Sequence, residues 1–203
     1  MKALTSLFLV FASSQSFADV ITPTTPVVLR SLIFYGSGCP DASVAAEIAE
    51  DKQSITFHFA NFEVSRGPGI SLMQSRKNCL ISFDLDYTSN YRFAVVGVEY
   101  SGFARVPSAG TAEYSNRFAF QTLTPTGSST ANWSVAGPKN SDLSVRNEVV
   151  PSGEIFSPCG EHRTMFWNSA VRLQTDPNQS ALITGDSLDL QTDYKIILRW
   201  RQC

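Results

Sequence analysis

The sequence predicts an all-β protein, an antiparallel β-sandwich of jelly-roll type held by two disulfides. Short runs of alternating apolar and polar residues recur along the chain, separated by clusters of Gly, Pro, Ser and Asn. No segment carries an apolar stripe of helical period over three turns. Four cysteines form an even set in a chain whose N terminus is typical of an exported protein.

Residues 1–18 are predicted to be a signal peptide. Lys2 gives a positive start, an apolar run follows, and small residues precede Asp19 at the positions that signal peptidase reads. The apolar run is shorter than the ~20 residues that span a bilayer, and no later segment is long enough either. We therefore expect a secreted, periplasmic or extracellular protein with no membrane span.

The prolines and threonines of residues 19–26 indicate an exposed lead-in, and residues 27–203 are expected to form one β-sandwich domain. Residues 27–35 are apolar and β-branched, which favours a first strand. Residues 43–50 are ambiguous, because their alanines favour helix while their apolar positions also fit a period of two.

The next segments alternate clearly. In residues 54–64, Ile55, Phe57 and Phe59 share one face, and Arg66-Gly67-Pro68-Gly69 ends the run. Residues 79–87 alternate again, with Ile81, Phe83, Leu85 and Tyr87 expected to face inward and Ser82, Asp84 and Asp86 outward. Further strands are predicted over residues 91–100, 114–122, 132–136, 166–174 and 194–202, for a total of about nine or ten.

Composition excludes some classes of function. The net charge is −2, with 16 Lys and Arg against 18 Asp and Glu, whereas a nucleic-acid-binding protein usually carries a basic stripe. We expect no nucleic acid among the partners.

The cysteines are predicted to be oxidised, since the compartment is oxidising and no C-x-x-C pair indicates zinc or redox chemistry. Three pairings are open. Cys39–Cys79 with Cys159–Cys203 closes two loops of about forty residues, each worth ~4 kcal/mol. A longer loop gains only ~1 kcal/mol more, so loop entropy does not choose the pairing; we favour the sequential one.

No catalytic set stands out, and no metal or cofactor is expected. Asp84 and Asp86 are two apart on a strand and point the same way, as paired carboxylates of a hydrolase would. His162 beside Glu161 is a second acid–base candidate, although no G-x-S-x-G motif supplies a nucleophile. A solvated surface role is the simpler reading for these residues.

Ligand-binding candidates are few. Trp133 lies beside a loop and is the tryptophan expected to be most exposed. If Arg66, Arg76, Lys77 and Arg105 converge, they form a basic patch suited to an anionic polymer or a carboxylated ligand. Asn132 and Asn178 begin N-glycosylation sequons.

Seven motifs in order give the chain a family resemblance: residues 36–40, 59–62, 67–69, 76–79, 102–105, 157–160 and 200–203, which include all four cysteines. Together they resemble the secreted domain-of-unknown-function family DUF4360. The resemblance implies a small exported disulfide-bonded β protein and implies no reaction.

We therefore expect a non-enzymatic extracellular or cell-surface binding module whose partner is a glycan or a protein. The alternative is a secreted hydrolase that uses the paired carboxylates or the His162–Glu161 site.

Overall fold

The computed structural model describes residues 21–121, 127–150, 153–186 and 191–203. The signal peptide predicted over residues 1–18 lies outside the described residues. Within the described ranges the chain is all-β apart from one short 3-10 helix, η1 (Leu72–Ser75). No described helix is long and apolar enough to cross a membrane.

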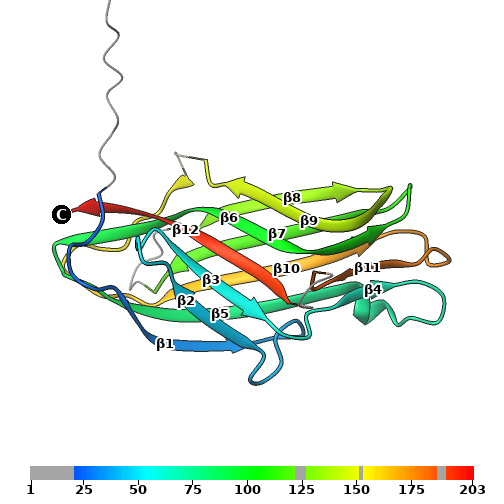
Figure 1. The fold of residues 1–203 in the computed structure, drawn as a ribbon, viewed down its shortest axis with the longest axis horizontal. Coiled ribbons are helices and arrows are strands. Elements are labelled where there is room, and N and C mark those ends of the chain that lie inside the picture. Colours follow the sequence, from blue (N-terminus) through cyan, green and yellow to red (C-terminus); the bar gives the residue numbers. More distant parts are fainter. Residues whose placement is uncertain (1–20, 122–126, 151–152, 187–190) are drawn as a thin grey trace, which may run out of the picture.

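The strands form two antiparallel sheets (Figure 1). The five-stranded sheet has the order β1 (Val28–Tyr35), β5 (Arg76–Asp86), β10 (Met165–Gln174), β7 (Thr111–Phe120) and β8 (Ser129–Ala136). The seven-stranded sheet has the order β2 (Val44–Ile48), β3 (Ser54–Phe59), β12 (Thr192–Gln202), β6 (Tyr91–Val106), β11 (Ala181–Thr184) and β4 (Val64–Arg66), with β9 (Lys139–Glu148) paired to β6. The predicted jelly-roll-like β-sandwich is confirmed.

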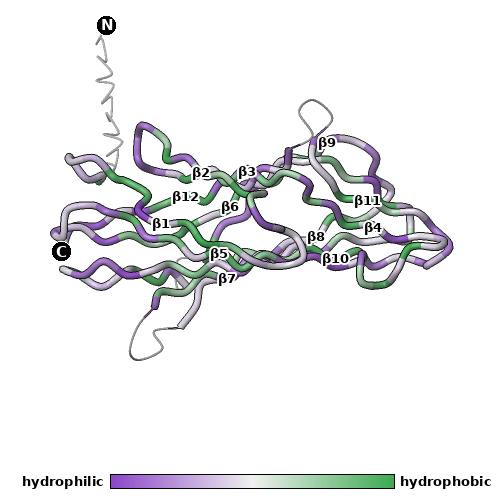
Figure 2. Tube along the Cα trace, turned by 90° about the horizontal axis from the view of Figure 1, so that it is seen from below, coloured by the Kyte–Doolittle hydropathy of each residue, from purple (hydrophilic) through white to green (hydrophobic). Residues whose placement is uncertain are grey.

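Alternation builds the core between the two layers, which Figure 2 shows edge-on. Phe57 and Phe59 of β3 face Trp167 of β10 across the sandwich, with ring centroids 5.1 and 6.3 Å from the tryptophan. The residues predicted to face inward on β3 and β5 are all buried: Ile55, Phe57, Phe59, Ile81, Phe83 and Leu85. Because successive side chains alternate across a strand, the intervening residues must form the outer faces.

Four segments differ from the prediction or go beyond it. The ambiguous residues 43–50 contain a strand, β2, and the run over 54–64 is divided between β3 and β4. The strands β9 and β11 were not predicted. The first has Leu143 and Val145 as its only large apolar residues, and the second has four residues, so neither gives a clear period of two.

The disulfides join Cys39 to Cys79 and Cys159 to Cys203, which confirms the sequential pairing. The Cys39 turn follows β1, and β1 pairs with β5, the strand that carries Cys79. Cys159 and Cys203 meet at the turn before β6, where the backbone NH of Cys203 donates to the carbonyl of Asn90. Strand neighbours therefore decide the pairing.

The lead-in touches the sandwich. Pro23 is buried, and its carbonyl accepts a hydrogen bond of 2.8 Å from Lys52 Nζ. Residues 24–26 are exposed.

Candidate functional site

The outer face of the five-stranded sheet presents exposed aromatic and apolar side chains along its β1 edge. Ile33 and Tyr35 of β1 are 63% and 64% exposed, although both are large. Their sequence neighbours Leu32 and Phe34 pack against the core instead. A large apolar side chain left in water on a sheet face is a common mark of a binding surface.

Register assembles this face from strands far apart in sequence. Ile33 lies opposite Ser82, which lies opposite Phe166, and Tyr35 lies opposite Leu80, which lies opposite Asn168. Asn168 in turn lies opposite Arg117 of β7. The result is two adjacent rows that combine apolar and aromatic side chains with an amide, a hydroxyl and a guanidinium.

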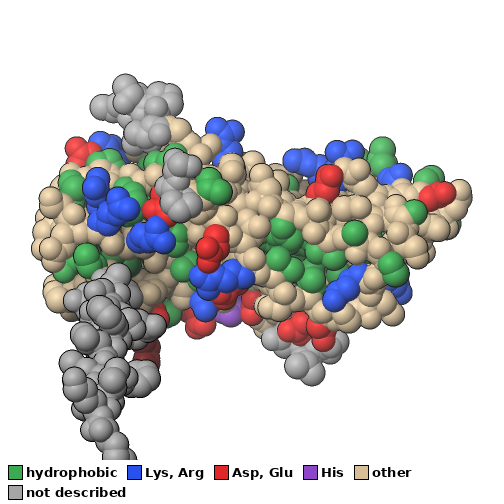
Figure 3. Space-filling model, turned by 90° about the horizontal axis from the view of Figure 1, so that it is seen from above, with side chains coloured by type: hydrophobic (Ala, Val, Ile, Leu, Met, Phe, Trp, Pro, Cys, Tyr) green, Lys and Arg blue, Asp and Glu red, His purple; other side chains and the backbone are tan. Residues whose placement is uncertain are grey.

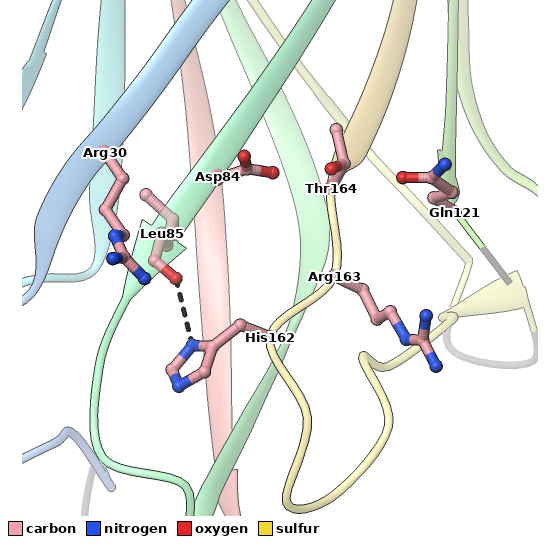
Figure 4. Close-up of a pocket in the computed structure, with 7 residues that line it drawn as sticks. All are labelled: Arg30, Asp84, Leu85, Gln121, His162, Arg163 and Thr164. Atoms are coloured by element: carbon pink, nitrogen blue, oxygen red, sulfur yellow. Dashed lines mark hydrogen bonds between the residues drawn. The ribbon is translucent and has the colours of Figure 1, made fainter.

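A polar pocket of about 280 Å³ continues this face at one end (Figure 4). We call it the end pocket; it is lined by Arg30, Asp84, Leu85, Gln121, His162, Arg163 and Thr164. In Figure 4, Asp84 and Thr164 lie close together along the upper edge of the group, with His162 and Arg163 below them.

Asp84 is the acceptor of the end pocket. Its Oδ2 accepts a hydrogen bond of 2.7 Å from Ser31 Oγ, whereas its Oδ1 is buried with no partner. A buried carboxylate oxygen without a partner is costly, so a hydroxyl or amide that enters the pocket would satisfy it.

Histidine and arginine side chains form the opposite wall. His162 Nδ1 lies 3.2 Å from the carbonyl oxygen of Leu85, so Nδ1 carries a proton and donates. The ring also contacts Tyr87 edge-on, at 4.8 Å between centroids. Arg163 is paired with Glu161, and Arg30 Nε lies 3.9 Å from Asp86.

These contacts bear on the two hydrolase candidates. Asp84 and Asp86 share the outer face as predicted, but the first is bonded to Ser31 and the second faces Arg30. Glu161 is paired with Arg163, whereas His162 contacts the carbonyl of Leu85. In the described ranges, no three His, Cys, Asp or Glu side chains are grouped to hold a metal ion.

The outer face of the seven-stranded sheet has a different character. His58 Nδ1 lies 2.8 Å from Asp193 Oδ1, and Glu99 accepts from both Arg146 and Lys195. Its charges satisfy one another across neighbouring strands, which leaves fewer groups for a ligand than the face around Tyr35.

The four predicted basic residues do not converge as a set. Arg76 and Lys77 are consecutive on β5, so they point to opposite faces. Arg105 is exposed on β6, in register with Leu182. Arg66 lines a hollow together with Arg172, a residue that the sequence reading missed. Arg172 of β10 lies directly opposite Arg76.

Trp133 lies at the edge where β8 and β9 meet, and as predicted it is the most exposed of the three tryptophans, since Trp167 and Trp200 are buried. Its ring stacks on Tyr114 at 4.9 Å with an interplanar angle of 9° and is half-buried. Figure 3, which looks onto this edge, shows a band of hydrophobic side chains between charged ones. The inward direction of Trp133 on β8 explains the burial, since Ala131 on the same side is also buried.

The sequence reading missed most of the face around Tyr35. Alternation places Ile33 and Tyr35 on one side of β1, and that signal was available. The pairing of β1 with β5 and of β5 with β10 was not, and it alone brings Phe166 and Asn168 beside them.

The fold and site define a class, a disulfide-bonded β-sandwich with one open sheet face and a polar pocket at its end. The chain belongs to the DUF4360 family, described as a domain of unknown function, whose model matches residues 25–203. A curated relative from Arthroderma benhamiae, described as an uncharacterized secreted protein, is 31% identical over 178 residues. That match covers 87% of this chain and 72% of the relative.

Two solved structures with a similar chain path are carbohydrate-binding modules. TmCBM27, described by its specific mannan recognition, has a TM-score of 0.34 and 10% identity, and the match covers 86% of this chain and 99% of that one. TmCBM61, in complex with β-1,4-galactotriose, has a TM-score of 0.31 and 6% identity, with 86% and 90% covered.

Proposed function

We propose that this protein is a secreted carbohydrate-binding module that holds an oligosaccharide on the outer face of the five-stranded sheet. The observation that carries the proposal is the exposure of Tyr35 beside an ordered set of polar side chains. Export is supported by the predicted signal peptide, by the two disulfides and by the description of the relative as secreted.

Sugar chemistry fits the mixture of groups on this face. The C–H side of a pyranose ring packs on an aromatic ring such as Tyr35, while its hydroxyls need both donors and acceptors. Asn168 supplies both, Arg117 supplies donors, and Asp84 in the end pocket supplies an acceptor.

The dimensions suit an extended ligand. Leu80 and Asp84 lie four residues apart on β5, a distance of ~13 Å at the rise of an antiparallel strand. A short oligosaccharide laid along β5 would reach from the ring of Tyr35 into the end pocket.

The test is a glycan array followed by affinity measurement on the polysaccharides that bind. Tyr35→Ala is expected to weaken binding about tenfold, equivalent to ~1.4 kcal/mol, because it removes the stacking surface. The matched control is Met73→Ala, which removes an exposed side chain from a different part of the molecule.

Two outcomes contradict the proposal: no glycan bound above background, or binding that Tyr35→Ala leaves unchanged. Capture of a protein partner through Tyr35 in place of a glycan would also overturn it.

A further inference from the structure

A second surface, at the other end of the sandwich, combines apolar and basic groups. The loop that follows β4 ends in η1 and projects at the end away from the C terminus (Figure 1). It carries three exposed apolar side chains, which we call the apolar tip: Ile70, Leu72 and Met73, exposed by 40%, 70% and 83%.

The loop's own hydrogen bonds hold these side chains outward. Ser71 caps η1 by accepting from the backbone NH of Met73 at 3.4 Å. Ser75 is buried and donates to the carbonyl of Leu72 at 2.7 Å. Gly69 has a φ of 75° with nothing within 4 Å of an added Cβ, so the loop turns in open space. The tip is a convex projection and not a groove.

Arginines surround the base of the tip. A hollow of about 330 Å³ is lined by Arg66, Leu72, Ser75, Arg172, Leu173, Gln174 and Thr175. Arg66 is fixed by donating from Nε to the carbonyl of Thr175 at 2.8 Å. Arg76 lies opposite Arg172 across the strand pair.

The charge of this region is locally positive in a chain of net charge −2. Residues 66–76 contain two arginines and no Asp or Glu. The carboxylate placed closest by register is Glu113, opposite Arg172. In the described part of the chain, Arg66, Arg76 and Arg172 form no ion pair.

We propose that this end of the molecule docks on a membrane surface that carries anionic lipid. Leu72 and Met73 would enter the boundary between headgroups and acyl chains, and the hollow between Arg66 and Arg172 would receive a headgroup phosphate. Apolar side chains at the end of a projection, backed by basic ones, are the combination that interfacial binding requires. A soluble polyanion would use the arginines and gain nothing from the exposed Leu72 and Met73.

The two proposed surfaces lie at opposite ends of β5, with Arg76 at one end and Asp84 near the other. Eight residues of strand separate Arg76 from Asp84 by ~27 Å, and Leu80, opposite Tyr35, lies ~13 Å from Arg76. Membrane contact at the tip therefore leaves the end pocket open, and the face between Tyr35 and that pocket runs away from the membrane. The two proposals are independent, and either one stands if the other fails.

The experiment is cosedimentation of the exported protein with vesicles of phosphatidylcholine alone and of phosphatidylcholine with phosphatidylglycerol. We expect binding to the anionic vesicles that weakens with added salt. Leu72→Ser/Met73→Ser should reduce it more than ~10-fold, and Arg172→Gln about 5-fold. Every sample has the same N terminus, so any contribution from residues that precede residue 21 cancels in these ratios.

The controls distinguish a membrane from other partners that could bind the apolar tip and its arginines. Tyr35→Ala should bind vesicles as the wild type does, and thermal melts should show that each variant is folded. Inorganic phosphate in excess should compete only weakly. The proposal is overturned if wild type binds no vesicles, if Leu72→Ser/Met73→Ser binds equally well, or if the same double change abolishes a self-association seen by gel filtration without lipid. Binding to a soluble polyanion that needs Arg172 but not the apolar tip would overturn it as well.

Discussion

Each disulfide should contribute about 4 kcal/mol to the stability of the fold, although one is buried and the other is on the surface. The cysteines of the bridges are separated by 40 and 44 residues. In the loop-entropy relation, a closed loop of this length removes about 13 cal/mol/K from the unfolded chain, which is ~4 kcal/mol at 25 °C.

Burial makes the two bridges differ in a second respect. Cys39 and Cys79 are 1% and 0% exposed, whereas Cys159 and Cys203 are exposed. Replacing the buried pair with alanine also removes two sulfur atoms from a packed interior, a further cost of ~1–2 kcal/mol. We therefore expect Cys39→Ala/Cys79→Ala to lose ~5–6 kcal/mol and Cys159→Ala/Cys203→Ala to lose ~4 kcal/mol.

The assay is guanidinium denaturation at 25 °C followed by tryptophan fluorescence, since Trp167 and Trp200 are both buried. Each double variant should show a larger m-value as well as a lower midpoint, because its unfolded chain expands further. Far-UV circular dichroism first checks that each variant is folded in buffer. A loss below ~1 kcal/mol for both pairs would refute the loop-closure reasoning; a smaller loss for the buried pair than for the exposed pair would refute the packing reasoning.

Three further predictions follow from the same packing. Without denaturant, mild reductant should reduce the exposed Cys159–Cys203 bridge before the buried Cys39–Cys79 bridge. Peptide mapping of the alkylated cysteines would show the order, and the reverse order would contradict the idea that burial protects a bridge. Gly36→Ala should destabilise the fold by more than ~2 kcal/mol, because φ is 147° and an added Cβ would lie 2.2 Å from the carbonyl oxygen of Asn78. Gly69→Ala, where an added Cβ would lie in open space, should cost only ~1 kcal/mol. Chemical denaturation measures both losses. Burial raises the pKa of three core tyrosines, Tyr100, Tyr114 and Tyr194, above the ordinary value of 10.0. The folded state therefore keeps protons that the unfolded chain releases, and stability should be complete below pH 10 and fall above it by up to ~4 kcal/mol per pH unit. Of the six tyrosines in the chain, these three should add to the absorbance at 295 nm only as the protein unfolds, and a gradual rise before unfolding that corresponds to more than the other three would count against the reasoning.

Local pattern was sufficient for the strands that bury one face. Ile55, Phe57 and Phe59 alternate with polar residues because one side of β3 lies in the core and the other in solvent. The same reasoning failed for β9, which pairs along β6 with few apolar residues of its own. Its place in the sheet is decided by its partner, so its own sequence contains little signal.

The candidate sites depend on register, which single-strand periodicity does not contain. Tyr35 and Asn168 lie in the same row only because β5 stands between β1 and β10. Asp84 was predicted to face outward, and it does, but the loop that brings His162 beside it is positioned by contacts with Leu85 and Tyr87.

Strand alternation separates the four basic residues, Arg66, Arg76, Lys77 and Arg105, that the sequence suggested as one patch. Arg76 and Lys77 are adjacent on β5, and a period of two forbids them from sharing a face. The sequence predicted this strand to begin only at residue 79, so the separation of the two side chains was not predicted. Arg105 lies in the same sheet as Arg66 but on its opposite face, because Arg105 is in register with Leu182 of β11 whereas Arg66 is in register with Ala181. The arginines that do gather come from β4, β5 and β10, and they gather beside exposed leucine and methionine. If this end of the sandwich acts as one surface, vesicle binding must therefore weaken both with added salt and on loss of the exposed apolar side chains.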